Sequence, residues 1–169
     1  LFECAGPGAQ FAFADRTEEF GLLDNVDDRG GAVGDLDLDG DLDLLVTPTV
    51  GRLRYYENRV PTPGAGWLEV LPVTQTSAPG GVGVEVEWTD AAGWTHLRVV
   101  GADAPTASQN EGIAHMGLGS AAYVDLTVRF PSGIVRTASG VAPNSRIQVV
   151  EPELVRVSHP TISAITAAP

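Results

Sequence analysis

The sequence predicts an all-β protein, because apolar and polar residues alternate along several short segments that are separated by turn residues. Around Val84 and Val86, and again around Leu126 and Val128, apolar residues recur at every second position, which is the period of a strand. The chain also contains 20 glycines and 12 prolines, which favour turns over long helices. Short strands with regular turns are typical of an antiparallel sandwich or barrel.

The individual elements follow from the same alternation. We expect strands within residues 31–34, 44–47, 82–88, 97–99, 126–130 and 147–149. Turn residues at 89–93, 131–133 and 143–145 separate the later strands. A weak helical signal is confined to residues 17–23.

Changes in composition divide the 169-residue chain into three segments. A proline- and glycine-rich stretch at 61–66 separates an aspartate-rich segment from a valine-rich one. After Glu151 the chain becomes rich in Thr, Ala, Ser and Pro. We therefore expect a first segment at 1–60, a β domain at 61–152, and a terminal strand with a linker or tail at 153–169.

The charge balance excludes some partners. Acidic residues outnumber basic residues 22 to 10, giving a net charge of −12, so neither nucleic acid nor an anionic membrane surface would be attracted. No apolar stretch approaches the ~18 residues that a membrane span requires, so we expect no membrane insertion. The single cysteine, Cys4, can form no internal disulfide.

Residues 35–43 carry the strongest chemical signal. Aspartates occupy the alternate positions Asp35, Asp37, Asp39, Asp41 and Asp43. Two carboxylates ~4 Å apart repel by about 4 kcal/mol at an effective dielectric constant of ~20, before screening by salt. A divalent cation removes this repulsion, and Ca²⁺ accepts six to eight oxygen ligands in flexible geometry.

We predict that Asp35, Asp37, Asp39 and Asp43 ligate calcium through their side chains and that Asp41 does so through its backbone carbonyl. Gly40 stands where such a loop must turn sharply. Magnesium is a poorer candidate because it keeps more of its water. The alternative is a solvated acidic hairpin without metal. The nearby acidic cluster at residues 24–28 lacks the alternating spacing and is expected to be an exposed loop or, alternatively, a second ion site.

An EF-hand is excluded by counting along the loop. Its twelfth position requires a bidentate Glu, and that position is Val46. The flanking segments 31–34 and 44–47 favour strands over helices. The pattern therefore indicates a calcium-loop β-hairpin that is packed on, or linked to, an antiparallel β-sandwich or barrel.

Residues 20–22, 31–46 and 53–58 resemble an FG-GAP (VCBS-type) repeat, the calcium-loop unit of integrin α-chain β-propellers. Residues 115–119, 124–133 and 141–151, with Asn144 before the last strand, resemble the ASPIC/UnbV module of the cartilage acidic protein family and its bacterial relatives. The resemblance implies an extracellular, calcium-binding protein. A propeller needs about four to eight blades, whereas this chain has room for one repeat. Either the chain is part of a longer protein, or the hairpin packs on the second module.

The sequence shows no pattern that predicts an enzyme. Ser132 lies between Pro131 and Gly133, which favours a turn over the Gly-x-Ser-x-Gly elbow of hydrolases. Glu85 and Glu87 share one face of a strand and are expected to be a charged surface. The three histidines, His96, His115 and His159, lack zinc-type spacing, and His115 is expected to be structural.

We therefore expect a secreted or cell-surface protein that acts as a calcium-binding structural or adhesion module, with an extracellular protein or a glycan as its partner. The alternative function is a calcium-dependent carbohydrate-binding accessory domain. Of the three tryptophans, Trp67 and Trp88 are expected in the core. Trp94 follows a turn and is a candidate for sugar stacking, although packing at the core or edge is favoured for it.

Overall fold

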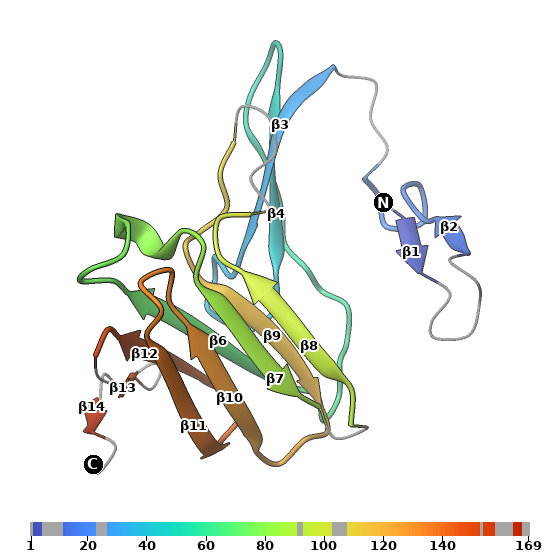
Figure 1. The fold of residues 1–169 in the computed structure, drawn as a ribbon. Coiled ribbons are helices and arrows are strands. Elements are labelled where there is room, and N and C mark those ends of the chain that lie inside the picture. The colour runs from blue at the N-terminus through green and yellow to red at the C-terminus, as the bar shows by residue number, and fades with distance from the viewer. Residues whose placement is uncertain are drawn as a thin grey trace.

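The computed structural model describes residues 2–4, 12–22, 27–90, 93–102, 108–152, 154–157 and 164–166. Its regular structure is β, which confirms the predicted fold class. Among the described residues the one helical element is the short 3-10 helix η1 (Pro79–Gly81). Figure 1 shows a two-layer sandwich from which a smaller sheet projects. The chain begins with a separate pair of short strands, β1 (Phe2–Cys4) and β2 (Phe13–Asp15).

Two sheets form the sandwich, with strand orders β11-β10-β7-β8 and β14-β13-β12-β6-β9. The first contains β7 (Glu85–Thr89), β8 (Thr95–Val99), β10 (Val124–Arg129) and β11 (Val135–Val141). The second contains β6 (Gly66–Val73), β9 (Ala114–Gly119), β12 (Ser145–Val150), β13 (Leu154–Val157) and β14 (Ala164–Thr166).

One pairing departs from the predicted antiparallel sandwich. Strand β12 runs parallel to β6, with Ile147 opposite Val70. The chain crosses from the first sheet to the second between β11 and β12, so β12 enters the second sheet in the direction of β6. The other pairings described within the two sheets are antiparallel.

The core of the sandwich follows the predicted alternation. Along β10, Val124, Leu126 and Val128 are buried, whereas Asp125 and Arg129 are exposed. Strands β7 and β12 bury alternate residues in the same way. All the buried hydrophobic residues of the described chain lie between Leu68 and Val149. The sandwich therefore has a core of its own.

The tryptophans differ from prediction in two cases. Trp88 is in the core, 4% exposed, and stacks on His96 with ring centroids 4.9 Å apart. Trp94 is 62% exposed, because it lies in the turn before the edge strand β8, where no neighbouring strand covers it. Trp67 is half-buried and lies outside the core cluster.

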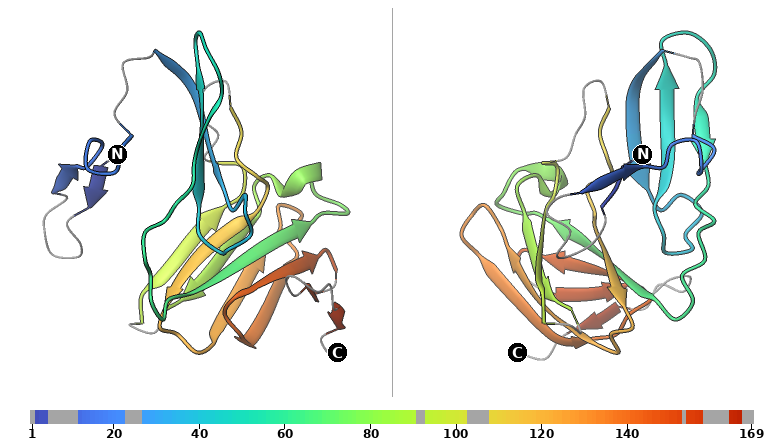
Figure 2. Two further views of the ribbon diagram at one scale, coloured as in Figure 1. Left: turned by 180° about the vertical axis from the view of Figure 1, so that it is seen from behind. Right: turned by 90° about the vertical axis from the view of Figure 1, so that its right-hand side faces the viewer.

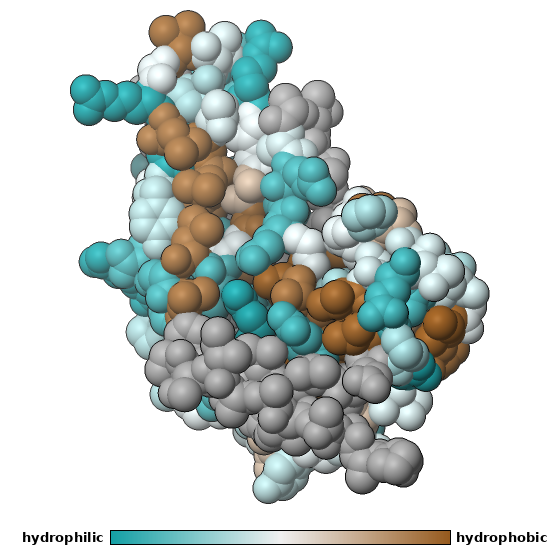
Figure 3. All heavy atoms as spheres, turned by 90° about the vertical axis from the view of Figure 1, so that its left-hand side faces the viewer, coloured by the Kyte–Doolittle hydropathy of each residue, from teal (hydrophilic) through white to brown (hydrophobic). Residues whose placement is uncertain are grey.

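The projecting sheet contains the predicted hairpin and a third strand. It has the order β3-β4-β5, formed by β3 (Asp28–Gly34), β4 (Asp43–Pro48) and β5 (Arg54–Tyr56). Both views of Figure 2 show it standing away from the sandwich layers. In the face drawn in Figure 3, apolar side chains run along this projecting part, and Val33, Leu36 and Leu38 are at least 40% exposed. This sheet contributes no residue to the core cluster, so contacts outside the core must hold it in place.

A buried carboxylate fastens two loops at one end of the sandwich. Glu151, 1% exposed, accepts hydrogen bonds from the backbone N–H groups of Gln75, Thr76 and Ser77 at 2.9–3.1 Å. It also accepts hydrogen bonds from the hydroxyls of Ser77 and Ser132. The hydrogen bond from Ser132, with those from the three N–H groups, lowers the pKa of Glu151 from 4.5 to about 2. Ser132 itself lies in the predicted turn, between β10 and β11.

This network predicts an acid-sensitive contribution to stability. Glu151→Gln removes the charge and places an amide against N–H donors, so the Tm at pH 7 should fall by roughly 5–10 °C. Because the folded pKa is depressed, the stabilisation is full above pH 4.5 and is lost as the pH falls through about 2. The difference in Tm between the wild type and Glu151→Gln, measured by circular dichroism, should therefore become smaller towards pH 2. Glu87→Gln, which removes an exposed ion pair with Arg129, is the control. Equal melting of the wild type and Glu151→Gln at pH 7 would contradict this role.

Candidate metal centre

The aspartate loop, residues 35–43, joins β3 to β4. The last pair of the β3–β4 ladder is Gly34 and Asp43, so the hairpin closes just where the aspartates begin. The tight path of the loop needs left-handed backbone conformations, with φ of +66° at Leu38 and +98° at Gly40. The alternating leucines Leu36, Leu38 and Leu42 point partly to solvent, 37–48% exposed. The loop therefore places these leucines towards solvent and brings the carboxylates of Asp35, Asp37 and Asp39 together.

Three of the five predicted ligands converge in the structure. One carboxylate oxygen from each of Asp35, Asp37 and Asp39 lies within 4.8 Å of the others. Two oxygens bound to one Ca²⁺ at 2.3–2.6 Å are at most about 5 Å apart, so this spacing suits a shared calcium ion. The loop is also held by hydrogen bonds to Asp35, whose carboxylate accepts the N–H groups of Asp39 and Gly40, each at 3.1 Å.

Asp43 lies at the base of the loop and plays a different part. It is 1% exposed, and its carboxylate accepts hydrogen bonds from Leu36 N–H, Tyr55 O–H and Asn58 N–H at 2.9–3.1 Å. Desolvation and the hydrogen bond to Asp43 raise the pKa of Tyr55 to about 12, so its hydroxyl remains a donor. Asp43 thus joins the loop to β5 and to the chain after it. Neither Asp43 nor Asp41 belongs to the group of three converging carboxylates, and their part in binding calcium stays a prediction.

The electrostatics of the loop favour a cation. Burial, followed by repulsion from Glu69, raises the pKa of Asp35. Desolvation and the neighbouring aspartates, Asp39 first, raise the pKa values of Asp37 and Asp41. One oxygen of Asp41, Oδ1, is buried without a hydrogen-bond partner in the described part of the chain. A divalent cation would offset the burial and the mutual repulsion of these carboxylates, so the residues present fit the predicted calcium ion.

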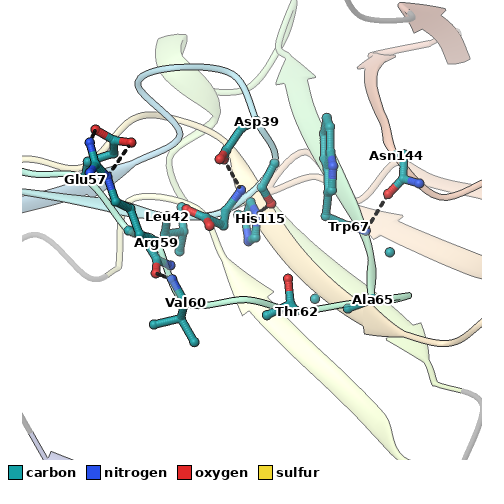
Figure 4. Close-up of a pocket in the computed structure, with 15 residues that line it drawn as sticks. Asp39, Leu42, Glu57, Arg59, Val60, Thr62, Ala65, Trp67, His115 and Asn144 are labelled. Carbon is teal, nitrogen blue, oxygen red and sulfur yellow. Dashed lines mark hydrogen bonds and ion pairs between the residues drawn. The ribbon is translucent and has the colours of Figure 1, made fainter. Parts of the chain in front are cut away.

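Gly40 fixes the loop to the sandwich. A Cβ atom at this position would lie 1.8 Å from Nε1 of Trp67, so the indole of β6 packs directly against the glycine backbone. The Gly40 carbonyl lies 2.8 Å from His115 Nε2 on β9 and accepts its hydrogen bond. Figure 4 shows His115 below the loop residue Asp39, with Trp67 to the right of both. His115 therefore has the structural hydrogen-bonding role that was predicted for it.

Two further hydrogen bonds join the hairpin to the chain before β9. Asn110 Oδ1 accepts the N–H of Val33 at 2.9 Å, and the Ser108 hydroxyl donates to the Gly31 carbonyl at 2.6 Å. The hairpin thus packs on the second module. The sequence does not predict the roles of Asn110, Ser108 and Trp67, because these contacts join residues up to 77 positions apart and leave no local pattern.

The remaining sequence candidates lie elsewhere. Asp27 accepts a hydrogen bond from the Thr49 hydroxyl, and Asp28 is paired with Arg54, so neither joins the converging aspartates. Residues 24–26 of the acidic cluster, and His159, lie outside the described residues. His96 is paired with Asp90 at 2.8 Å.

The second segment is similar to a known protein family. Residues 74–155 match the ASPIC and UnbV family. The ASPIC and UnbV match begins after β6 and ends in β13, so it covers most of the sandwich but leaves out the aspartate loop. The chain is also similar to Cartilage acidic protein 1 of Xenopus tropicalis, with 32% identity over 113 residues. The aligned part is 65% of this chain and 17% of that relative. Within the described residues, the structure has no helix with the length and apolar character of a membrane span.

The contact between Gly40 and Trp67 can be tested without any metal. Gly40→Ala should destabilise the protein by roughly 2–4 kcal/mol, because Gly40 has a φ of +98° and its new methyl group would overlap the Trp67 indole. Gly31→Ala is the matched control in β3, since a Cβ there meets nothing nearer than 3.8 Å. Urea unfolding in EDTA measures both variants. Equal unfolding midpoints for the two variants would show that the indole does not constrain the loop.

Proposed function

We propose that this chain is a calcium-binding extracellular module with a structural or adhesive role, in which calcium orders the aspartate loop. The observation that carries the proposal is the convergence of Asp35, Asp37 and Asp39 within 4.8 Å on a loop that is fixed to the sandwich. The calcium ion would neutralise the loop and so stabilise the projecting sheet against the sandwich. No step of catalysis is needed for this role, and we propose that the chain is not an enzyme.

The ion would be held by a set of oxygens on one short loop. Asp35, Asp37 and Asp39 would supply carboxylate oxygens, and Asp41 its backbone carbonyl. Asp43 already accepts three hydrogen bonds, but a carboxylate has about four acceptor sites, which leaves room for one bond to the metal. Together with the β3-β4-β5 sheet, this ligand pattern supports the proposal that residues 20–58 are an FG-GAP (VCBS-type) repeat.

The proposed location is outside the cell, secreted or at the cell surface. Weak loops of this kind fill at about 10⁻⁴–10⁻³ M calcium, as in extracellular modules. The similarity to a protein named for cartilage and for acidity, and the net charge of −12, agree with such a location. Expression of the tagged full-length protein in its own organism tests this, and recovery solely from the reducing cytosol would contradict it.

Calcium binding should be measurable directly. Calorimetric titration of the metal-free protein with CaCl₂ should give one site, with a weaker response to MgCl₂. Asp37→Ala and Asp39→Ala should each weaken binding by tenfold or more, about 1.4 kcal/mol or greater, because each removes a converging ligand. Asp41→Ala should have a milder effect, since the backbone carbonyl remains. Asp27→Ala is the control, and wild-type protein that gives no heat at millimolar calcium would refute the site.

Chelation should affect the two parts of the chain unequally. Calcium at ten times its Kd stabilises the folded loop by about 1.4 kcal/mol. In EDTA the projecting sheet should therefore melt earlier than the sandwich, giving two transitions or a clearly lower Tm by scanning calorimetry. Asp37→Ala in calcium should reproduce the EDTA curve. Melting curves that coincide with and without EDTA would show that calcium, even if bound, does not order the loop.

A further inference from the structure

A cleft of about 770 Å³ opens between the aspartate loop and the sandwich. In Figure 4, Asp39, His115 and Trp67 lie along one side, and the segment with Val60 and Thr62 runs along the opposite side. Gly117 of β9 also lines the cleft. The volume is within the range of small-molecule sites, roughly 300–1,000 Å³. Neither the ASPIC and UnbV match nor the calcium ligands account for this space.

The cleft presents neutral hydrogen-bonding groups beside an aromatic ring. In the described structure the indole N–H of Trp67, the hydroxyl of Thr62 and the side-chain amide nitrogens of Asn58 and Asn144 have no protein partner. Asn144 also holds the backbone of Trp67 in place. The backbone N–H of Asn144 donates to the Trp67 carbonyl at 2.6 Å, and Asn144 Oδ1 accepts the backbone N–H of Trp67 at 3.3 Å. The side chain of Asn144 and the backbone that carries Trp67 are therefore positioned before a ligand arrives.

Most charges around the cleft are already engaged. Glu57 pairs with Arg59 through two contacts of 2.8 and 2.9 Å. Asp39 belongs to the group of converging carboxylates that would face calcium. Asp41 remains, and it would repel an anionic ligand such as a sulfated or sialylated sugar. The charges thus disfavour anions and leave hydrogen bonding and ring stacking as the available interactions.

We propose that this cleft binds a neutral carbohydrate, with Trp67 as the stacking platform and Thr62, Asn58 and Asn144 as hydrogen-bonding groups. A sugar ring combines an apolar C–H face with a rim of hydroxyls, which matches an indole beside amides and a hydroxyl. This inference rests on the proposed calcium site, because the loop residues Asp39 and Asp41 form one wall of the cleft. It places the site at Trp67 rather than at the exposed Trp94, whose neighbour Asp90 is engaged by Trp94 N–H and His96.

The test uses an array of neutral, sialylated and sulfated glycans, probed with the full chain in calcium and in EDTA. Gly117→Ile fills the cleft, and the β-branched side chain suits a strand position where a Cβ meets nothing within 4 Å. Thr62→Arg blocks the opposite, exposed side. Trp94→Ala is the matched control for an aromatic site elsewhere. Calcium titration of each variant by calorimetry is run in parallel.

Neutral glycans should be retained in calcium, and their binding should fall about tenfold or more in EDTA and in both cleft variants but not in Trp94→Ala. Calcium binding itself should survive in Gly117→Ile and Thr62→Arg. Calcium binding without retention of any neutral glycan overturns the sugar site and leaves the calcium module intact. Retention of sulfated glycans or basic peptides alone also overturns it, as does binding that depends on Trp94. Failure of calcium binding in the wild type removes the proposed function instead.

Discussion

The mutual repulsion of carboxylates in one short loop is the constraint on which the projecting sheet depends. One carboxylate oxygen from each of Asp35, Asp37 and Asp39 lies within 4.8 Å of the others, and burial makes the charge of Asp35 harder to accommodate. The β3-β4-β5 sheet contributes nothing to the hydrophobic core, so apolar burial cannot offset this cost. The contacts of the loop and of β3 with the rest of the chain stabilise the sheet, and the proposed cation would add to them.

Two buried carboxylates show how the surroundings decide the role of an acidic residue. Glu151 accepts hydrogen bonds from three N–H groups and two hydroxyls, which lowers its pKa to about 2. Its charge therefore stabilises the contact between the two loops that donate to it. Asp35 also accepts backbone N–H groups, but burial and the nearby Glu69 outweigh them and raise its pKa. The donors around Glu151 therefore satisfy its charge within the protein, whereas those around Asp35 leave a demand for positive charge.

The local features of the fold could be predicted from the sequence, and the contacts between segments could not. Alternation along Val124–Arg129 fixes which residues face the core, and the spacing of the aspartates with Gly40 indicates a hairpin loop for a cation. The parallel pairing of β12 with β6 was missed because no local pattern records the direction in which a distant strand enters a sheet. The same holds for Trp67, whose position against Gly40 depends on how two separately encoded segments dock.

Gly40 contributes both to the local shape of the loop and to the contact between segments, because this one residue satisfies two independent requirements. The loop needs a positive φ at this position in order to bring its carboxylates together, and the sandwich needs a surface without a side chain against which Trp67 can pack. The carbonyl of the same residue accepts the hydrogen bond from His115. Any movement of the loop that separates the aspartates must therefore also move its contact with β6 and β9. Occupancy of the proposed metal site would for this reason be coupled to the shape of the adjoining cleft through direct contacts rather than through a distant conformational change.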